Sequence, residues 1–183
     1  MNKNNILTII AAAGIGERFG GMTPKQYAMV NGNTIIESAV KPFVDSEYVS
    51  EIIIAISEND NYIKNQNFYN LDKIKYVIGG SSRQESIRNA LNAAEKEYEY
   101  VLTHDAARPN IVKDDITNLY KDIKHSNASC SFLYTPVYDS IKKTSSEDTT
   151  LDKNKFYLVQ TPQISNFNHL KSSLEKCIDQ NIN

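Results

Sequence analysis

The sequence lacks long hydrophobic runs, and it has few cysteines and little net charge. Its longest apolar runs, Ile9–Ala13 and Ile52–Ile56, are far too short to cross a bilayer, which takes about 20 apolar residues. The two cysteines, Cys130 and Cys177, do not have the spacing of a metal or redox site. With 20 basic and 22 acidic residues the net charge is −2, which gives no electrostatic support for general nucleic-acid binding. We therefore expect neither a membrane protein nor a nucleic-acid binder.

The chain does have enough apolar material for one sizeable core, because 40% of its 183 residues are hydrophobic. Its first residues resemble a secretory signal, with Lys3 before an apolar stretch that starts at Ile6. Thr8 interrupts that stretch and Gly-rich polar sequence follows it, so a buried first strand fits better. We expect a cytoplasmic protein, with Cys130 as a buried core thiol and no disulfide.

Apolar runs suited to buried strands alternate with amphipathic segments suited to helices. The expected strands are Ile6–Ala12, Glu51–Ser57, Lys75–Ile78, Tyr100–His104 and Cys130–Thr135. The expected helices are Thr34–Val44, Arg83–Lys96, Lys113–Lys124 and Asn166–Asp179. The alternation predicts an α/β fold with a mostly parallel sheet covered on both faces. Residues 142–155 are polar and lie between β-like segments, so they predict a projecting hairpin arm or, alternatively, a mobile surface loop.

A glycine-rich loop follows the first expected strand. In open α/β sheets, ligands bind at the carboxyl ends of the strands, and clusters of backbone N–H groups hold anions. Phe19 breaks the Rossmann pattern GxGxxG and Met22 breaks the Walker pattern, so neither familiar phosphate loop is present. The loop instead offers two cations, Arg18 and Lys25, which suit a polyphosphate and its transition-state charge.

Three more segments place polar groups after expected strands. The Gly-rich segment 79–83 suits an anion or a base, or is an ordinary turn with Ser82 as helix N-cap. Asp105 suits a Mg²⁺ ion shared with substrate phosphates, or caps the next turn, whereas the adjacent His104 is left without a role. Thr161 precedes a proline, which favours an extended backbone, so its hydroxyl is available to a ligand.

Arginine is scarce, and its placement supports anion binding. Three of the four arginines, Arg18, Arg83 and Arg108, lie in these loops, where they favour bidentate anion contacts. The fourth, Arg88, fits a solvated helix face.

Five motifs taken in order resemble the methylerythritol-phosphate cytidylyltransferase family: AAAGIGERFG…PKQY, GGSSRQESIRNAL, HDAARP, PVYDSIKK and QTPQ. The resemblance extends from Ile6 to about Leu174. It implies a Rossmann-like sheet with helices on both faces and a β-arm, about residues 136–160, that embraces a second subunit in a homodimer. It also implies transfer of a cytidylyl group from CTP to 2-C-methyl-D-erythritol 4-phosphate, with Mg²⁺ or another divalent cation and release of pyrophosphate, in isoprenoid precursor biosynthesis.

Together with the loop arguments, the resemblance assigns roles to individual residues. Catalytic roles fall on Arg18, Lys25, Asp105 and Lys153. Nucleotide binding falls on Ala12, Ala13, Gly14, Gly16, Arg18, Lys25, Gly80, Ser81, Arg83, Ser86, Asp105 and Ala106. Acceptor binding falls on Asp105, Arg108, Ser140, Lys153 and Thr161, and Asp105 is the expected metal ligand.

The sequence departs from the family in three places. Ser140 stands where the family usually has Thr, and keeps the hydroxyl. Lys153 stands where it usually has Arg, so the charge remains but the bidentate fork does not. The chain ends at Asn183, where the family continues with a strand, a Lys near the active site and a last helix. We therefore expect residues 1–183 to form a single nucleotidyltransferase domain that is truncated, or part of a longer or fused protein.

Two other functions remain open at this point. One is a cytidylyltransferase for a different sugar or polyol phosphate, such as ribitol 5-phosphate. The other is an inactive nucleotide-binding fragment, which the missing C-terminal segment would allow.

Overall fold

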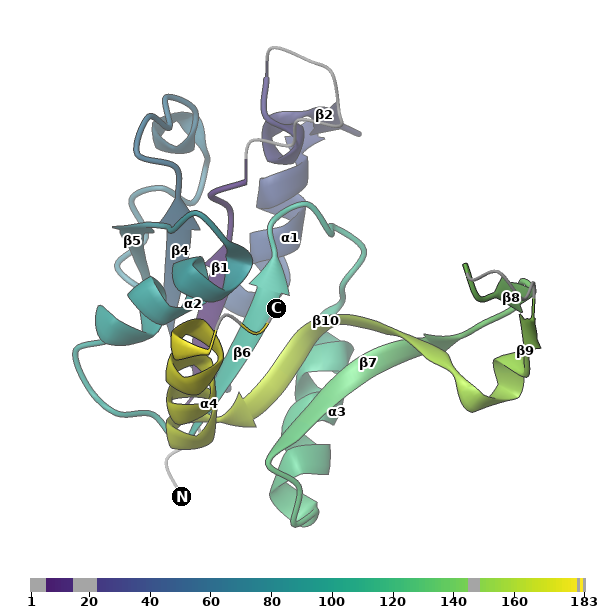
Figure 1. Cartoon of the computed structure of the whole chain (residues 1–183). Helices are drawn as coiled ribbons and strands as arrows, with labels where there is room; N and C mark the ends of the chain where they lie inside the picture. The colour runs from purple at the N-terminus through teal and green to yellow at the C-terminus, as the bar shows by residue number, and fades with distance from the viewer. Residues whose placement is uncertain (1–5, 15–22, 145–148, 181, 183) are drawn as a thin grey trace.

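The structure is a computed structural model that describes residues 6–14, 23–144, 149–180 and 182. Within these residues a six-stranded sheet has the order β5-β4-β1-β6-β10-β7 (Figure 1). Its strands are β1 (Ile6–Ala11), β4 (Val49–Ile56), β5 (Ile74–Ile78), β6 (Tyr100–Asp105), β7 (Cys130–Pro136) and β10 (Tyr157–Asn166). β5, β4, β1 and β6 pair in parallel, whereas β10 is antiparallel to both β6 and β7. The predicted α/β fold with a mostly parallel sheet is confirmed.

Helices cover both faces of the sheet, as predicted. They are α1 (Ile35–Val44), α2 (Arg83–Asn92), α3 (Lys113–His125) and α4 (Phe167–Asp179). α1 and α3 pack on one face, and α2 and α4 pack together on the other (Figure 1). The predicted helices match within one residue at each end, except that α2 ends at Asn92 and not at Lys96, because Ala93 already closes its last turn.

The central strand β1 is buried on both faces. Ile6 and Ile10 pack with the α1 and α3 side chains, while Leu7 and Ile9 pack with those of α2 and α4. This alternation follows from the two-residue side-chain period of a strand. Ala11 pairs with Ala55 of β4 and Asp105 of β6, so the carboxyl ends of three neighbouring strands meet at one edge.

Polar side chains fix where the helices begin. Thr34 accepts the Glu37 N–H and caps α1, and Asn166 accepts the His169 N–H and caps α4. Short elements connect the larger ones: η2 (Lys25–Tyr27), β2 (Met29–Val30), β3 (Asn33–Thr34) and η3 (Ile63–Asn65). Among the described residues, no helix is long and apolar enough to span a membrane.

The predicted arm projects from the sheet (Figure 1). The extended ends of β7 and β10 lead to a small antiparallel ribbon, formed by β8 (Ile141–Lys142) and β9 (Thr150–Leu151), and η4 (Lys153–Lys155) follows it. Apolar side chains are exposed on β7, on β10 and on the segments that join these strands to the ribbon: Tyr134, Tyr138, Phe156, Tyr157, Leu158 and Val159.

The prediction of a buried thiol at Cys130 is wrong. Cys130 begins β7, which is one of the two edge strands of the sheet, and its side chain is exposed. Its apolar neighbours in the sequence belong to a strand that leaves the core for the arm. Cys130 and Cys177 are both free thiols.

Candidate active site

A cavity of about 590 Å³ lies at the carboxyl ends of β1 and β6. The loops that follow β1, β5 and β6 enclose it, which is where an open α/β sheet binds its ligand. Every predicted nucleotide-binding residue that the structure describes lines it: Ala12, Ala13, Gly14, Lys25, Gly80, Ser81, Arg83, Ser86, Asp105 and Ala106. Gly16 and Arg18 lie outside the described residues.

The buried amide of Gln26 holds the end of β1. Its Nε2 donates to the carbonyl oxygens of Ala12, at 2.8 Å, and Gly14, at 3.1 Å. Gln26 follows Lys25 in η2, so the same amide fixes the turn that carries the Lys25 ammonium to the cavity.

The loop after β5 approaches the end of β1 so closely that only glycine fits at position 79. A Cβ built on Gly79 would lie 2.4 Å from the Cβ of Ala13. The Gly80 N–H donates to Ser86 Oγ at 3.0 Å, and that hydroxyl donates to the Ser82 carbonyl at 2.9 Å. Ser82 is the N-cap of α2, as the alternative interpretation of this segment had it, and the same turn also forms one wall of the cavity.

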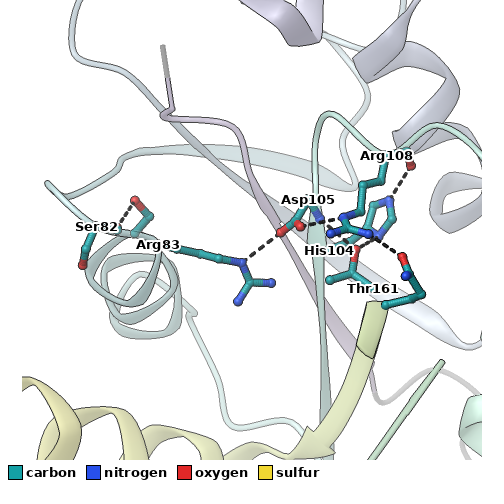
Figure 2. A network of polar contacts seen from close by, with 8 residues as sticks. Ser82, Arg83, His104, Asp105, Arg108 and Thr161 are labelled. Atoms are coloured by element: carbon teal, nitrogen blue, oxygen red, sulfur yellow. Dashed lines mark hydrogen bonds and ion pairs between the residues drawn. The ribbon is translucent and has the colours of Figure 1, made fainter. Parts of the chain in front are cut away.

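Asp105, the last residue of β6, lies between two arginines (Figure 2). Arg83 Nε donates to its Oδ1 at 2.9 Å, and Arg108 Nε donates to its Oδ2 at 3.0 Å. Burial would raise the pKa of the carboxyl, but the two guanidinium groups outweigh it and hold that pKa below its ordinary value. The carboxylate is therefore ionised and offsets one of the two positive charges. Among the described residues its partners are the two guanidinium groups, so the alternative of a turn cap is not seen.

His104 lies behind Asp105 and is 1% exposed. Its Nε2 is 3.0 Å from the carbonyl oxygen of Arg108, and its Nδ1 is 3.0 Å from Thr161 Oγ1 (Figure 2). Burial lowers the pKa of His104 from 6.5 to about 4, so the ring is neutral at neutral pH. Thr161 Oγ1 also accepts the backbone N–H of Asp105, at 3.4 Å.

Gln160 joins this network from β10. Its Oε1 accepts from Arg108 Nη1, and its Nε2 donates to Thr135 Oγ1 at 3.3 Å. These contacts bring the motifs HDAARP and QTPQ side by side, although Arg108 and Gln160 are 52 positions apart. Two of the predicted acceptor residues, Arg108 and Thr161, thus both contact Asp105 on its β10 side.

Ser140 and Lys153, the other predicted acceptor residues, lie on the arm. Ser140 is exposed just before β8, and Lys153 Nζ donates to the Tyr138 carbonyl at 2.7 Å. Lys153 lines a second cavity, of about 630 Å³, between β7 and the arm. Within one chain, the structure does not bring these two residues to the strand-end cavity.

Sequence reasoning missed Gln26, Gln160 and the bonding role of His104, and it did not foresee the close approach that requires glycine at position 79. Their partners are distant in the chain, as in the bond between His104 and Thr161, which are 57 positions apart. Both glutamines lie in motifs that carry the resemblance, PKQY and QTPQ, and this was the one signal that pointed to them.

Asp105 is also the candidate metal ligand. No group of three or more His, Cys, Asp or Glu side chains within the described residues could hold a metal ion. One carboxylate still fits Mg²⁺, which commonly binds through one or two carboxylates together with substrate phosphates and water. The residues present thus fit an ion that arrives with a nucleotide.

A mostly parallel sheet with polar loops gathered at its strand ends defines an α/β protein with a ligand site at that edge. The family described as 2-C-methyl-D-erythritol 4-phosphate cytidylyltransferase (IspD) matches residues 6–183. The chain belongs to this family.

Individual relatives agree with that assignment. The chain is 38% identical over 177 residues to a 2-C-methyl-D-erythritol 4-phosphate cytidylyltransferase of Wigglesworthia glossinidia brevipalpis, covering 96% of this chain and 76% of the relative. It is 35% identical to the protein of that name from Haemophilus ducreyi, and the match covers 100% of this chain and 80% of that relative. The crystal structure of the Francisella tularensis protein of that name superimposes on this chain with a TM-score of 0.82 at 34% identity. The superposition covers 98% of this chain and 80% of the other.

Proposed function

We propose that this chain transfers a cytidylyl group from CTP to 2-C-methyl-D-erythritol 4-phosphate and releases pyrophosphate, in isoprenoid precursor biosynthesis. Membership of the cytidylyltransferase family supports this reaction. The observation that carries it onto particular residues is the strand-end cavity, whose lining includes all the described residues of the predicted nucleotide site.

The chemistry is an in-line displacement at phosphorus. An oxygen of the acceptor phosphate attacks the α-phosphorus of CTP, a new P–O bond forms, and the bond to the β-phosphate oxygen breaks as pyrophosphate leaves. A phosphate monoester has a second pKa near 6, so at neutral pH it is already a nucleophile and needs no general base. Catalysis then depends on positioning and on stabilising the charge that develops.

The cavity residues divide this work. Ala12, Ala13 and Gly14, with Gly16 outside the described residues, form the loop around the triphosphate. Lys25, with Arg18 outside the described residues, stabilises the charge on the attacked phosphate. Gly80, Ser81 and Ser86 face the cytosine and its neighbouring groups, and Arg83 and Ala106 complete the nucleotide side.

Asp105 separates the nucleotide from the acceptor. In this proposal its carboxylate holds Mg²⁺, or another divalent ion, which would neutralise phosphate charge when it is bound. Arg83 and Arg108 now neutralise that carboxylate, and each can turn to a phosphate when a ligand arrives. Arg108 and Thr161 bind the acceptor on the β10 side.

The same proposal includes a homodimer formed through the arm. Exposed apolar side chains on the arm and its approach, such as Tyr138 and Tyr157, support it, because large apolar patches often mark protein interfaces. In a two-fold dimer, Ser140 and Lys153 of one copy contact the acceptor phosphate in the cavity of the other. A cytoplasmic location is likewise proposed, and the two free thiols agree with a reducing compartment.

Pyrophosphate release tests the proposed reaction. The purified chain is given CTP and Mg²⁺ with 2-C-methyl-D-erythritol 4-phosphate, ribitol 5-phosphate or another polyol phosphate as acceptor. We expect release with the first acceptor, loss of release when Mg²⁺ is chelated, and a strong decrease for Asp105→Asn. ATP, GTP and UTP in place of CTP serve as controls for the choice of nucleotide.

Two results would contradict the proposal. Preferential use of ribitol 5-phosphate would assign a different acceptor. Binding of CTP without release for any acceptor would make the chain a nucleotide-binding fragment.

A further inference from the structure

His104 makes hydrogen bonds that its neighbours restrict in direction. The Arg108 carbonyl oxygen, 3.0 Å from Nε2, can only accept, so Nε2 must carry a hydrogen. A neutral imidazole has one N–H, which leaves Nδ1 as an acceptor. The Thr161 hydroxyl, 3.0 Å from Nδ1, must then donate to it.

The direction of the Thr161 hydrogen follows from this arrangement. That hydrogen points toward the buried ring, and Oγ1 turns a lone pair to the N–H of Asp105, at 3.4 Å. Thr161 therefore ties β10 to β6 at the residue that separates the two proposed substrates. The bond from Nε2 fixes the main chain at Arg108, whose side chain reaches Asp105 and Gln160.

We propose that His104 is a positioning residue for the proposed reaction: its ring, as the Nε2–H tautomer, bridges the Arg108 carbonyl and the Thr161 hydroxyl, and so orients the acceptor side of the site. This inference rests on the proposed function for its kinetic consequence only. His104 cannot act as a base on the substrate, because the ring is 1% exposed and both nitrogens are occupied.

The location of the bonded partners predicts which step depends on His104. Neither Arg108 nor Thr161 is among the residues that line the nucleotide cavity, whereas both meet Asp105 from the β10 side. Loss of the bridge should therefore affect acceptor KM and kcat and leave CTP affinity within about two-fold. A neutral hydrogen bond of this kind corresponds to about a 2- to 10-fold effect.

Two substitutions separate the two bonds. The amide of His104→Asn occupies the place of Nδ1 and can still pair with Thr161, but does not reach the Arg108 carbonyl. The amide of His104→Gln reaches the place of Nε2 and keeps the Arg108 bond, but loses Thr161. Because His104→Gln and Thr161→Val remove the same bond, their effects on acceptor kcat/KM should not add, whereas those of His104→Asn and Thr161→Val should add.

The decisive experiment is nitrogen-15 NMR of the imidazole in the full labelled chain at neutral pH. It needs no substrate, so it is independent of whether the proposed reaction is correct. We expect a protonated Nε2 and an unprotonated Nδ1 that accepts a hydrogen bond. In Thr161→Val the chemical shift of Nδ1 should change, whereas that of Nε2 should not. A ring protonated on Nδ1 would overturn the proposal, as would additive effects of His104→Gln and Thr161→Val or a loss of CTP affinity equal to the loss of acceptor affinity.

Discussion

The strand-end cavity and the arm are built in opposite ways. In the cavity region, charged and polar side chains bond to one another, as Asp105 does to Arg83 and Arg108. On the arm, Tyr138 is 78% exposed and Tyr157 is 53% exposed. One region is organised by its own chain, and the other leaves an apolar surface that suits a second copy. The predictions below test that contrast, from the largest expected effect to the smallest.

Lys25→Ala should have the largest effect, because it removes a cation from the cavity. We expect turnover to decrease by about 10²- to 10³-fold, as when one transition-state donor is lost, together with weaker CTP binding. Steady-state kinetics and calorimetry measure the two quantities. Lys121→Ala, an exposed lysine on α3, is the matched control and should behave as wild type. Unchanged CTP affinity in Lys25→Ala would remove the assigned role.

Acid should destabilise the chain through His104. Its pKa is 6.5 when exposed and about 4 when buried in the fold, so between these values the unfolded chain binds a proton that the folded chain does not. The free energy of unfolding should be unaffected by this group above pH 6.5 and should fall as pH is lowered, by up to about 3 kcal/mol near pH 4. Denaturant unfolding at several pH values measures it.

The matched variants for this pH effect are His104→Gln and His169→Gln. The first should flatten the pH dependence, whereas His169 is exposed on α4 and its replacement should leave the dependence intact. Equal slopes for wild type and His104→Gln would show that the ring is not held neutral by burial.

Gly79→Ala should disturb the cavity by forcing two loops apart. The added Cβ would lie 2.4 Å from that of Ala13, and overpacking of this kind costs about 1–3 kcal/mol of unfolding free energy. We also expect weaker CTP binding. Gly14→Ala is the control, because a Cβ there meets no atom of the described residues within 4 Å and should not change stability. Thermal unfolding of both variants compares them, and equal midpoints would contradict the close approach.

Lys153→Ala should have the smallest effect, confined to the acceptor. Loss of one charge-assisted contact should raise acceptor KM by about 10-fold and leave CTP affinity unchanged. Lys153→Arg should keep or lower KM, because the guanidinium fork grips two phosphate oxygens. Lys155→Ala, in the same short helix η4, is the control. An effect of Lys153→Ala on CTP affinity alone would place this lysine on the nucleotide side.

Much of the fold could be predicted because its strands are apolar and locally encoded. The run from Ile52 to Ile56 is a buried strand in any α/β arrangement, and Thr34 and Ser82 mark helix starts by their own chemistry. The antiparallel position of β10 could not be predicted. Its pairing with β6 uses Gln163–Asn166, a short mixed segment whose place depends on contacts about 60 positions away.

The site could be predicted as a set of loops but not as a network. Strand-end glycines and scarce arginines located the cavity, because ligands of such sheets bind where the strands end. The clamp of Arg83 on Asp105, and the bridge of His104 to Thr161, join segments 22 and 57 positions apart. The burial of Cys130 was predicted wrongly, because an apolar stretch of sequence does not reveal that its strand lies at a sheet edge.

Subunit complementation tests most directly the central claim that the arm of one copy completes the cavity of another. Lys25→Ala and Lys153→Ala are mixed in equal amounts, and subunit exchange is verified by mass. The assay uses acceptor well below KM, where a 10-fold rise in KM leaves Lys153→Ala alone with about a tenth of wild-type activity, so the average of the two parents is about a twentieth. Random pairing makes half the dimers mixed, and each of these has one site with both lysines, so activity should return to about a quarter of wild type. A mixture that stays at the average of its two parents, although exchange is complete, would contradict the account and assign the arm to its own chain.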